Sequence, residues 1–321
     1  MAIARTTMRS RAGSARAASS SVDRSKVQQR VLSWFDEHGR SFPWREHRDP
    51  FQTMVAEVML QQTQTGRVAP AYTTFLSKFP TVSSLAHASA MEVIQAWKGL
   101  GYNRRAVDLQ RSAQAIEHQY GGEVPSDPKT LRALPGIGEY SASAVACFAY
   151  DRQIPVVDVN VRRVLSRAAR GTDELSVDQT RAIAAEWLAP GDAYRWNQAL
   201  MDVGAMICRI DAPLCTQCPL KASCSYRAQG KNKAKREHRP PKQARFEGSS
   251  RQKRGGIIDH LRDTAGEGVS LAVLAKVIHP NGDRNLGWLV ELLEGLERDG
   301  LVEMTPGARR GSARGIVRLP A

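Results

Sequence analysis

Long apolar runs are absent from this chain of 321 residues, and strict alternation of apolar and polar residues is scarce. No segment approaches the roughly 18 consecutive apolar residues of a membrane-spanning helix, so a transmembrane protein is excluded. The N-terminus lacks the apolar centre of a secretory signal peptide, so we expect an intracellular protein, in the cytoplasm or nucleoid. Because Val, Ile and Thr rarely recur with a two-residue period, we expect no sheet-based core.

Acidic residues are outnumbered: 46 Lys and Arg against 32 Asp and Glu leave a formal net charge of +14. This excess favours a polyanionic partner, nucleic acid before an anionic membrane surface, although a basic surface without a specific partner has the same composition. The apolar fraction of 42% and the charged fraction of 24% are those of an ordinary globular protein. The length allows two domains, or one large domain with an appendage.

The composition divides the chain into four segments. Residues 1–24 are rich in Ala, Ser and Arg, which suits an organellar transit peptide as well as a disordered basic tail; we predict the tail and leave organelle targeting open. From 25 to 228, apolar residues recur at helical spacing. Residues 229–254 are basic, contain proline and have few apolar groups, so we interpret them as a linker.

The fourth segment, residues 255–321, has the pattern of a small module. Three helices with apolar periodicity (GIIDHLRD, SLAVLAKVI and NLGWLVELLEGLERDG) precede LVEMT, a loop rich in Gly and Arg, and GIVRLP. A long helix that runs into a short hairpin is typical of a winged helix-turn-helix, although other small helical modules share this pattern.

Cysteine is scarce, and four of the five cysteines fall within seventeen residues, spaced C-x6-C-x2-C-x5-C. Intracellular thiolates grouped this closely bind metal more often than they form disulfides. Zinc and an iron–sulfur cluster both accept four thiolates, so the ligand count leaves both open. Zinc sites tend to use two C-x2-C pairs and only one is present, which favours the cluster. The predicted ligands are Cys208, Cys215, Cys218 and Cys224, whereas Cys147 lies in an apolar helix as a core thiol.

The segment LPGIG at 134–138 predicts a tight turn before a helix that runs from Tyr140 to Tyr150. Gly136 and Gly138 allow positive φ and a close approach of backbone to ligand, and the free N–H groups at the helix start suit a phosphate. Structural turns of this kind are common, but the preceding DPKTLRAL helix completes a helix-hairpin-helix. We therefore predict DNA contacts at Leu134, Gly136 and Gly138.

With these features the chain resembles the endonuclease III superfamily, and most of all the adenine DNA glycosylases (the MutY family), from about residue 27 to 226. The marks, in chain order, are FPWR at 42–45, AEVMLQQTQ at 56–64, GLGYNRRA at 99–106, LPGIGEY at 134–140, VVDVNVRRV at 156–164 and NQALMDVGAMIC at 197–208. The resemblance implies an all-α fold of two helical domains with the substrate cleft between them. It also implies a 4Fe-4S cluster in a domain closed by the N-terminal helix and by the segment after Pro155.

Cleavage of an N-glycosidic bond requires a proton for the departing base and negative charge near the developing sugar cation. Two carboxylates in different environments meet these needs. Glu57 lies in the apolar stretch MVAEVM, which favours its protonated form. A lone Glu on a helix is normally a solvated surface charge, but the family places its general acid and water activator here.

By the same resemblance, Asp158 stabilises the sugar cation, and Asn160 supports this site. A carboxylate at a helix start is often only an N-cap. The two roles are compatible, because donated N–H bonds would also keep Asp158 ionised at neutral pH.

Tyr140 separates the reaction types of the superfamily. Bifunctional relatives carry a lysine here, whose amine attacks the sugar and permits strand cleavage. Because tyrosine cannot form that Schiff base, we predict a monofunctional glycosylase that leaves an abasic site. Some thymine-mismatch glycosylases share the tyrosine with the adenine glycosylases.

The target base must leave the duplex before it is excised. Gln62 and Tyr102 match positions that wedge into the stack around the extruded nucleotide and its partner, although a helix-end or packing role is the alternative for each. Arg45, Trp44 and Asp202 resemble residues that line the adenine pocket, and for Trp44 a plain core role competes with this assignment.

Many adenine glycosylases end in a Nudix-like β domain that recognises 8-oxoguanine, and the C-terminal module has the wrong pattern for it. We therefore predict double-stranded DNA with A:G or A:8-oxoguanine mispairs as the partner of a monomeric enzyme, and the sequence leaves open which mispair is preferred. The nearest alternative is a thymine or uracil mismatch glycosylase; Glu57 argues against it, because pyrimidines leave as stabilised anions without an acid. A catalytically silent DNA-binding protein is disfavoured by the two carboxylates and the hairpin.

Overall fold

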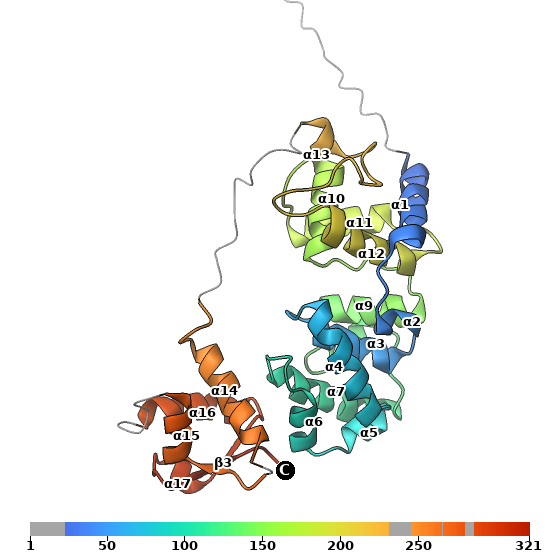
Figure 1. The fold of residues 1–321 in the computed structure, drawn as a ribbon. Coiled ribbons are helices and arrows are strands. Elements are labelled where there is room, and N and C mark those ends of the chain that lie inside the picture. Colours follow the sequence, from blue (N-terminus) through green and yellow to red (C-terminus); the bar gives the residue numbers. More distant parts are fainter. Residues whose placement is uncertain (1–22, 231–244, 265, 280–285) are drawn as a thin grey trace, which may run out of the picture.

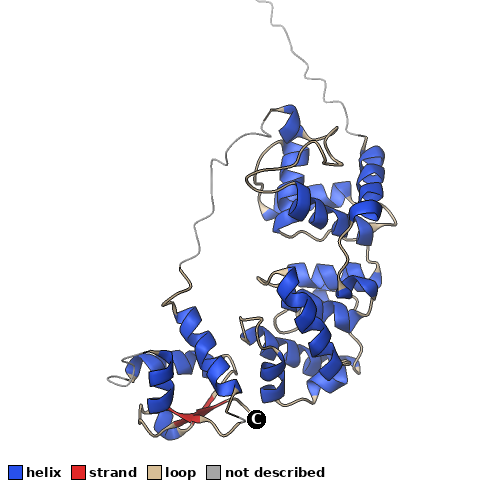
Figure 2. Cartoon of the chain, viewed as in Figure 1, coloured by secondary structure: helices blue, strands red, loops and turns tan. Residues whose placement is uncertain are grey.

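Helices dominate the computed structural model, which describes residues 23–230, 245–264, 266–279 and 286–321 (Figures 1 and 2). The predicted all-α class is confirmed, and the strands found among the described residues are short and lie near the C-terminus. The tail prediction for 1–22 and the linker prediction for 231–244 lie outside the described residues. No helix in the described ranges is both long and apolar enough to cross a membrane.

The first domain, here called the hairpin domain, spans residues 43–150. Its helices are α2 (Pro43–Glu46), α3 (Pro50–Leu60), α4 (Thr65–Lys78), α5 (Val82–Ala86), α6 (Ala90–Ala96), α7 (Arg104–Tyr120), α8 (Pro128–Arg132) and α9 (Glu139–Tyr150). The central helix α3 begins where Asp49 accepts the Gln52 N–H at 2.7 Å and Pro50 occupies the first turn. Nearly all of α3 is buried, and it packs on α4, α7 and α9.

The second domain, here called the cysteine domain, combines residues 23–42 with residues 151–230. It contains α1 (Arg24–His38), α10 (Val159–Arg170), α11 (Val177–Trp187), α12 (Ala193–Asp202), the π-helix η1 (Val203–Ile207) and α13 (Ser225–Ala228). As expected, the N-terminal helix closes this domain: α1 packs on α12 through Val27 and Val31. Cys147 of α9 is fully buried in the same core, which agrees with its prediction as a core thiol.

The C-terminal module has the expected order of a long helix followed by a hairpin. It consists of α14 (Ser250–Arg262), β1 (Val269–Ser270), α15 (Leu271–Ile278), α16 (Gly287–Arg298), β2 (Glu303–Met304), α17 (Pro306–Arg309) and β3 (Ile316–Arg318). The strands form an antiparallel sheet in the order β1-β3-β2, with Val317 opposite both Val269 and Met304. Its first helix begins at Ser250, inside the segment interpreted as linker, because the Ser249 side chain caps it.

Figure 1 shows the C-terminal module beside α6, far along the sequence from it. The contact is a shared core rather than a loose approach: Ile94 and Val107 of the hairpin domain belong to the same buried cluster as Ile257, Ile258 and Leu261 of α14. The module and the hairpin domain therefore present a continuous surface.

Candidate active site

Glu57 occupies a buried position on α3, where the side chain is 4% exposed. Tyr140, in the first turn of α9, is a hydrogen-bond partner of its carboxyl group. The Oε2 atom is buried and has no hydrogen-bond partner among the described residues. Burial raises the pKa of Glu57 to about 7, with a further upward contribution from Asp158 that the Tyr140 hydrogen bond and Arg45 partly offset. A protonated, incompletely satisfied acid inside a protein is a candidate proton donor.

The Tyr140 hydroxyl is held in its neutral form. Burial, followed by the charges of Glu57 and Asp158, raises its pKa well above 10. A neutral phenol can donate a hydrogen bond to the Glu57 carboxyl but offers no nucleophile comparable to an amine.

Asp158 is the N-cap of α10. Its Oδ1 accepts the Val161 N–H at 2.7 Å, and its Oδ2 accepts a hydrogen bond from Asn160 Nδ2 at 2.8 Å. These bonds lower the pKa of Asp158, but burial has the larger effect and raises it above its ordinary value. The site therefore holds two carboxyl groups, from α3 and α10, that influence each other's charge.

A chain of hydrogen bonds leads from Asp158 to the backbone of the first cysteine. Asn160 Oδ1 accepts from Arg163 Nη2 at 2.9 Å, and Arg163 also donates to the carbonyls of Gly204 and Cys208, each at 2.7 Å. Only glycine fits at 204, since an added Cβ would lie 2.6 Å from the Asn160 Cβ. Arg163 was not among the predicted site residues, although it stands in the motif VVDVNVRRV beside Asp158 and Asn160.

Arg45 and Asp202 form a buried ion pair next to this site. The Asp202 side chain is fully buried and accepts from Arg45 at 2.8 and 3.0 Å, and from the backbone N–H and Nε of Arg40 at 2.9 and 2.8 Å. Although burial works against it, the hydrogen bonds and charges of the two arginines lower the pKa of Asp202. Because both oxygens are engaged, Asp202 anchors the arginines. Trp44 stacks on Phe42, with ring centroids 4.8 Å apart.

Gln62 and Tyr102 lie on two adjacent loops and share an uncommon backbone conformation. Their φ angles are +57° and +45°, and non-glycine residues with positive φ are often found at functional sites. Arg105 joins the two loops through its two terminal nitrogens. Nη1 donates to the carbonyls of Val58, Met59 and Gln61. Nη2 donates to the Thr63 hydroxyl and to the carbonyls of Leu100 and Gly101.

Arg105 was also missed from sequence, where it passes for a second basic residue beside Arg104. Burial lowers its pKa to about 10, so it keeps its charge at neutral pH. A charged donor shared by two loops fixes the spacing of Gln62 and Tyr102.

The predicted hairpin joins α8 and α9, but its residues play different parts. Gly136 has φ of +73°, as expected, and an added Cβ would meet the Asp108 Cβ at 2.8 Å. Gly138 has ordinary extended geometry at the N-cap of α9, which corrects the expectation of positive φ; open space beside it leaves room for a ligand. Leu134 is 5% exposed, so its side chain packs in the core and only its backbone can face a ligand.

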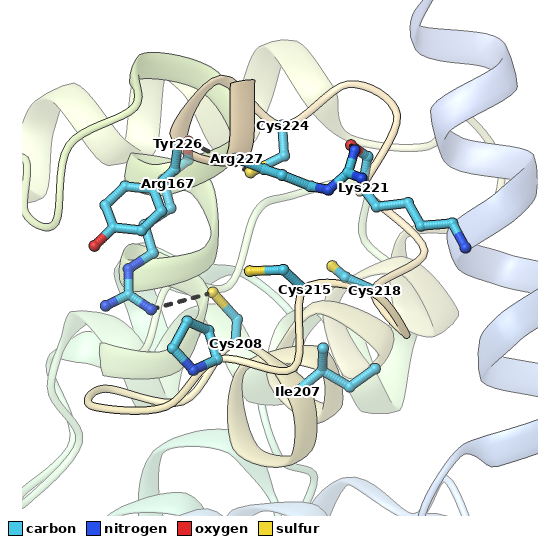
Figure 3. Close-up of a pocket in the computed structure, with 10 residues that line it drawn as sticks. Arg167, Ile207, Cys208, Cys215, Cys218, Lys221, Cys224, Tyr226 and Arg227 are labelled. Carbon is cyan, nitrogen blue, oxygen red and sulfur yellow. Dashed lines mark hydrogen bonds between the residues drawn. The ribbon is translucent and has the colours of Figure 1, made fainter. Parts of the chain in front are cut away.

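The four clustered cysteines line one cavity with Arg167, Lys221 and Arg227 (Figure 3). Arg167, 3% exposed, donates from Nη1 to Cys208 Sγ at 3.7 Å and stacks on Tyr226. Within the described ranges, no three His, Cys, Asp or Glu side chains lie close enough to hold a single metal ion. Four thiols around a common cavity are the donor set that a 4Fe-4S cluster takes, so these residues could hold one.

The family model described as "HhH-GPD superfamily base excision DNA repair protein" matches residues 55–190. A curated adenine DNA glycosylase of Mycolicibacterium smegmatis is 39% identical over 288 residues, which cover 87% of this chain and 93% of that protein. The chain belongs to the adenine DNA glycosylase family. The human adenine DNA glycosylase is 40% identical over 210 residues, 61% of this chain and 38% of that protein.

Solved structures support the fold of this glycosylase. A thermostable thymine-DNA glycosylase is similar with a TM-score of 0.61 and 30% identity, covering 64% of this chain and 97% of that chain. A non-covalent endonuclease III–DNA complex has a TM-score of 0.57 at 22% identity, covers 66% of this chain and 99% of that chain, and so supports the fold alone. These structures match about two thirds of this chain, whereas the Mycolicibacterium smegmatis protein matches 87% of it.

Proposed function

We propose that the chain is a monofunctional DNA glycosylase that removes adenine mispaired with guanine or 8-oxoguanine in base excision repair. The observation that carries this proposal is Glu57: a buried carboxyl group with a pKa of about 7 and an unpartnered oxygen, Oε2. An acid that holds its proton near neutral pH is what an adenine leaving group needs.

In the proposed reaction, Glu57 donates its proton to the imidazole-ring nitrogen of the extruded adenine. The bond between the base nitrogen and the sugar carbon breaks, its electron pair goes to the base, and positive charge develops on the sugar. The Asp158 carboxylate stabilises this cation. The Glu57 carboxylate then takes a proton from water while the water oxygen bonds the sugar carbon, so Glu57 regains its proton and an abasic site remains.

The supporting residues follow from their contacts. Asn160 holds Asp158 through the hydrogen bond at 2.8 Å, and Tyr140 holds Glu57. Arg45 has a buried Nε without a partner among the described residues, and we assign it to the adenine pocket, with Asp202 as its anchor and Trp44 beside it. Gln62 and Tyr102 enter the base stack, and the backbone of 134–138 meets a phosphate of the DNA.

Cys208, Cys215, Cys218 and Cys224 would hold a 4Fe-4S cluster. Glycosidic cleavage involves no electron transfer, so the cluster's part in this proposal is structural. It orders the cysteine loop, which carries Lys221 and Arg227, and through Cys208 it supports Arg163 and Asn160. Elemental analysis of the purified protein should find iron and inorganic sulfide in equal amounts, and stoichiometric zinc would contradict the assignment.

The decisive experiment is a single-turnover assay over a panel of duplexes that contain A:G, A:8-oxoguanine, T:G and U:G pairs. Release of free adenine from the first two, with intact strands before alkali treatment, supports the proposal. Release of thymine or uracil in preference to adenine would favour the mismatch-glycosylase alternative, and DNA binding without release of any base would favour a silent binding protein.

A further inference from the structure

The C-terminal module contacts the loop that carries Tyr102 through one buried side chain. Arg262, at the end of α14, is 3% exposed and donates from Nε and Nη2 to the Ile94 carbonyl at 3.1 and 2.9 Å. Its Nη2 also donates to Asn103 Oδ1 at 3.0 Å, and Nη1 pairs with Asp259 of its own helix. A buried guanidinium is stable only with such partners, so this contact fixes the end of α14 relative to Ile94 and Asn103 of the hairpin domain.

Asn103 lies between Tyr102 and the start of α7 in the hairpin domain. It is the N-cap residue of α7, but its side chain makes no capping hydrogen bond to that helix. It follows Tyr102 directly, whose φ is +45° and whose side chain is 45% exposed. The Asn103 amide is thus engaged by the module where it would otherwise cap α7, and its position sets the direction in which the chain leaves Tyr102.

The surface next to this contact is a groove that both parts build. Its walls come from the Gln62 loop and the Tyr102 loop on one side and from α14 on the other, where Arg251 and Arg254 stand. The groove has a volume of about 810 Å³, enough for a group the size of a nucleotide.

The long helix of the module, α16, carries little positive charge on its exposed face. The exposed side chains of α16 are Glu291, Glu294 and Arg298, and two carboxylates against one cation oppose contact with phosphates. The module docks on the hairpin domain through an apolar core, and Arg262 is a buried charged side chain beside that core.

From these contacts we infer that Arg262 is a positioning residue for the Tyr102 loop, through which the C-terminal module sets the insertion of Tyr102 into the DNA stack. The inference rests on the proposed function, because it assigns the module a part in base extrusion. Loss of Arg262 would leave Asn103 Oδ1 without this donor, and would leave the Ile94 carbonyl with the Trp97 N–H at 3.2 Å in place of three donors, which would release the loop.

Arg262→Gln tests this inference in the full-length protein. We expect its single-turnover rate of adenine release from an A:G duplex to fall about tenfold. Its affinity for an undamaged duplex should change less than about twofold, because Arg262 is buried away from the phosphates. A fluorescent adenine analogue next to the target should show slower unstacking in the variant, which a merely structural role would not produce. Arg262→Lys, which keeps the charge, should restore part of the rate.

Asp263→Asn is the matched control. Asp263 is the next residue of the module and pairs with Lys98 of the hairpin domain, but both side chains are exposed, so the rate should stay at the wild-type value. Tyr102→Ala provides the decisive background: if Arg262 acts through Tyr102, Arg262→Gln should cause no further loss there. If Arg262→Gln fails to fold, Asn103→Ala breaks the same contact from the loop side and should slow unstacking in the same way.

A wild-type rate for Arg262→Gln or Asn103→Ala overturns the inference, as does an equal loss from Arg262→Gln with and without Tyr102. Failure of the proposed function is a separate result, since it would show as no adenine release by the unmodified protein.

Discussion

The side chain of Tyr140 hydrogen-bonds the carboxyl group of Glu57, and this contact joins the first turn of the hairpin helix α9 to the centre of α3. A neutral phenol as the partner lowers the pKa of Glu57 less than burial raises it, whereas the positive charge of an ammonium group would lower it further. The hydrogen bond thus relates the helix that follows the DNA-binding turn to the group that donates the proton.

Glu57 should reduce the stability of the folded chain above neutral pH. Its pKa is raised from 4.5 to about 7, so the folded chain keeps this proton at pH values where the unfolded chain has lost it. The resulting loss of stability develops between these two values and is complete above about pH 7. Glu57→Gln removes this titrating group. The change in the free energy of unfolding that it causes should therefore be about 3 kcal/mol more favourable to the folded chain at pH 8 than at pH 4.

Denaturant unfolding at the two pH values measures this difference. Glu291→Gln, an exposed glutamate on α16, is the control and should show no such pH dependence. An equal effect of Glu57→Gln at both pH values would mean that the carboxyl is not buried in the way described.

Asp158→Asn should separate the two roles of this residue. Asparagine caps helices as well as aspartate does, so the unfolding temperature should change little. Adenine release should fall by about a hundredfold or more, because the neutral amide cannot stabilise a cation. Asp158→Ala should lose the cap as well and unfold earlier. A rate for Asp158→Asn within a few-fold of wild type would contradict the assigned role.

Gly204→Ala should disturb Asp158 from a distance. The added Cβ would lie 2.6 Å from the Asn160 Cβ and 3.0 Å from its carbonyl oxygen, so Asn160 must move and its hydrogen bond to Asp158 must lengthen. We expect about a tenfold slower adenine release. Gly66→Ala in α4, where nothing lies within 4 Å of an added Cβ, should keep the wild-type rate. Equal rates of adenine release by the two variants would contradict the supporting role of Asn160.

Tyr140→Lys should introduce some strand cleavage. An amine at this buried position faces Glu57 and Asp158, the two groups that handle the sugar and the base. It can attack the sugar carbon and form a Schiff base, which borohydride traps as a covalent protein–DNA adduct. Tyr140→Phe is the control and should give no adduct. No adduct above the Phe background would count against the assigned position of Tyr140.

Local features of the fold were predictable from the sequence. Apolar periodicity predicted the helices, and short motifs located Glu57, Asp158 and the cysteines, because helix formation and ligand spacing depend on neighbouring residues. Details of backbone conformation and burial were not predictable from the sequence. Gly138 has extended geometry and Leu134 is buried, and neither follows from the residue type.

Contacts between segments far apart in the chain could not be predicted from the sequence either. Arg105 and Arg163 resemble surface charges in the sequence, since most of their acceptors are backbone carbonyls, which carry no sequence signal. Arg262 binds the carbonyl of Ile94, 168 residues earlier, and only the folded chain brings these groups together. The module could therefore be delimited from the sequence, but its docking on the Tyr102 loop could not.

The most direct measurement of the central claim is the pH dependence of single-turnover adenine release, with Glu57→Gln beside the wild type. The protonated fraction of a carboxyl with a pKa of about 7 falls above that pH, so the wild-type rate should drop by about tenfold per pH unit on the alkaline side. Glu57→Gln should bind the A:G duplex with nearly unchanged affinity and release no adenine at any pH. Adenine release by this variant at a rate close to wild type would contradict the account.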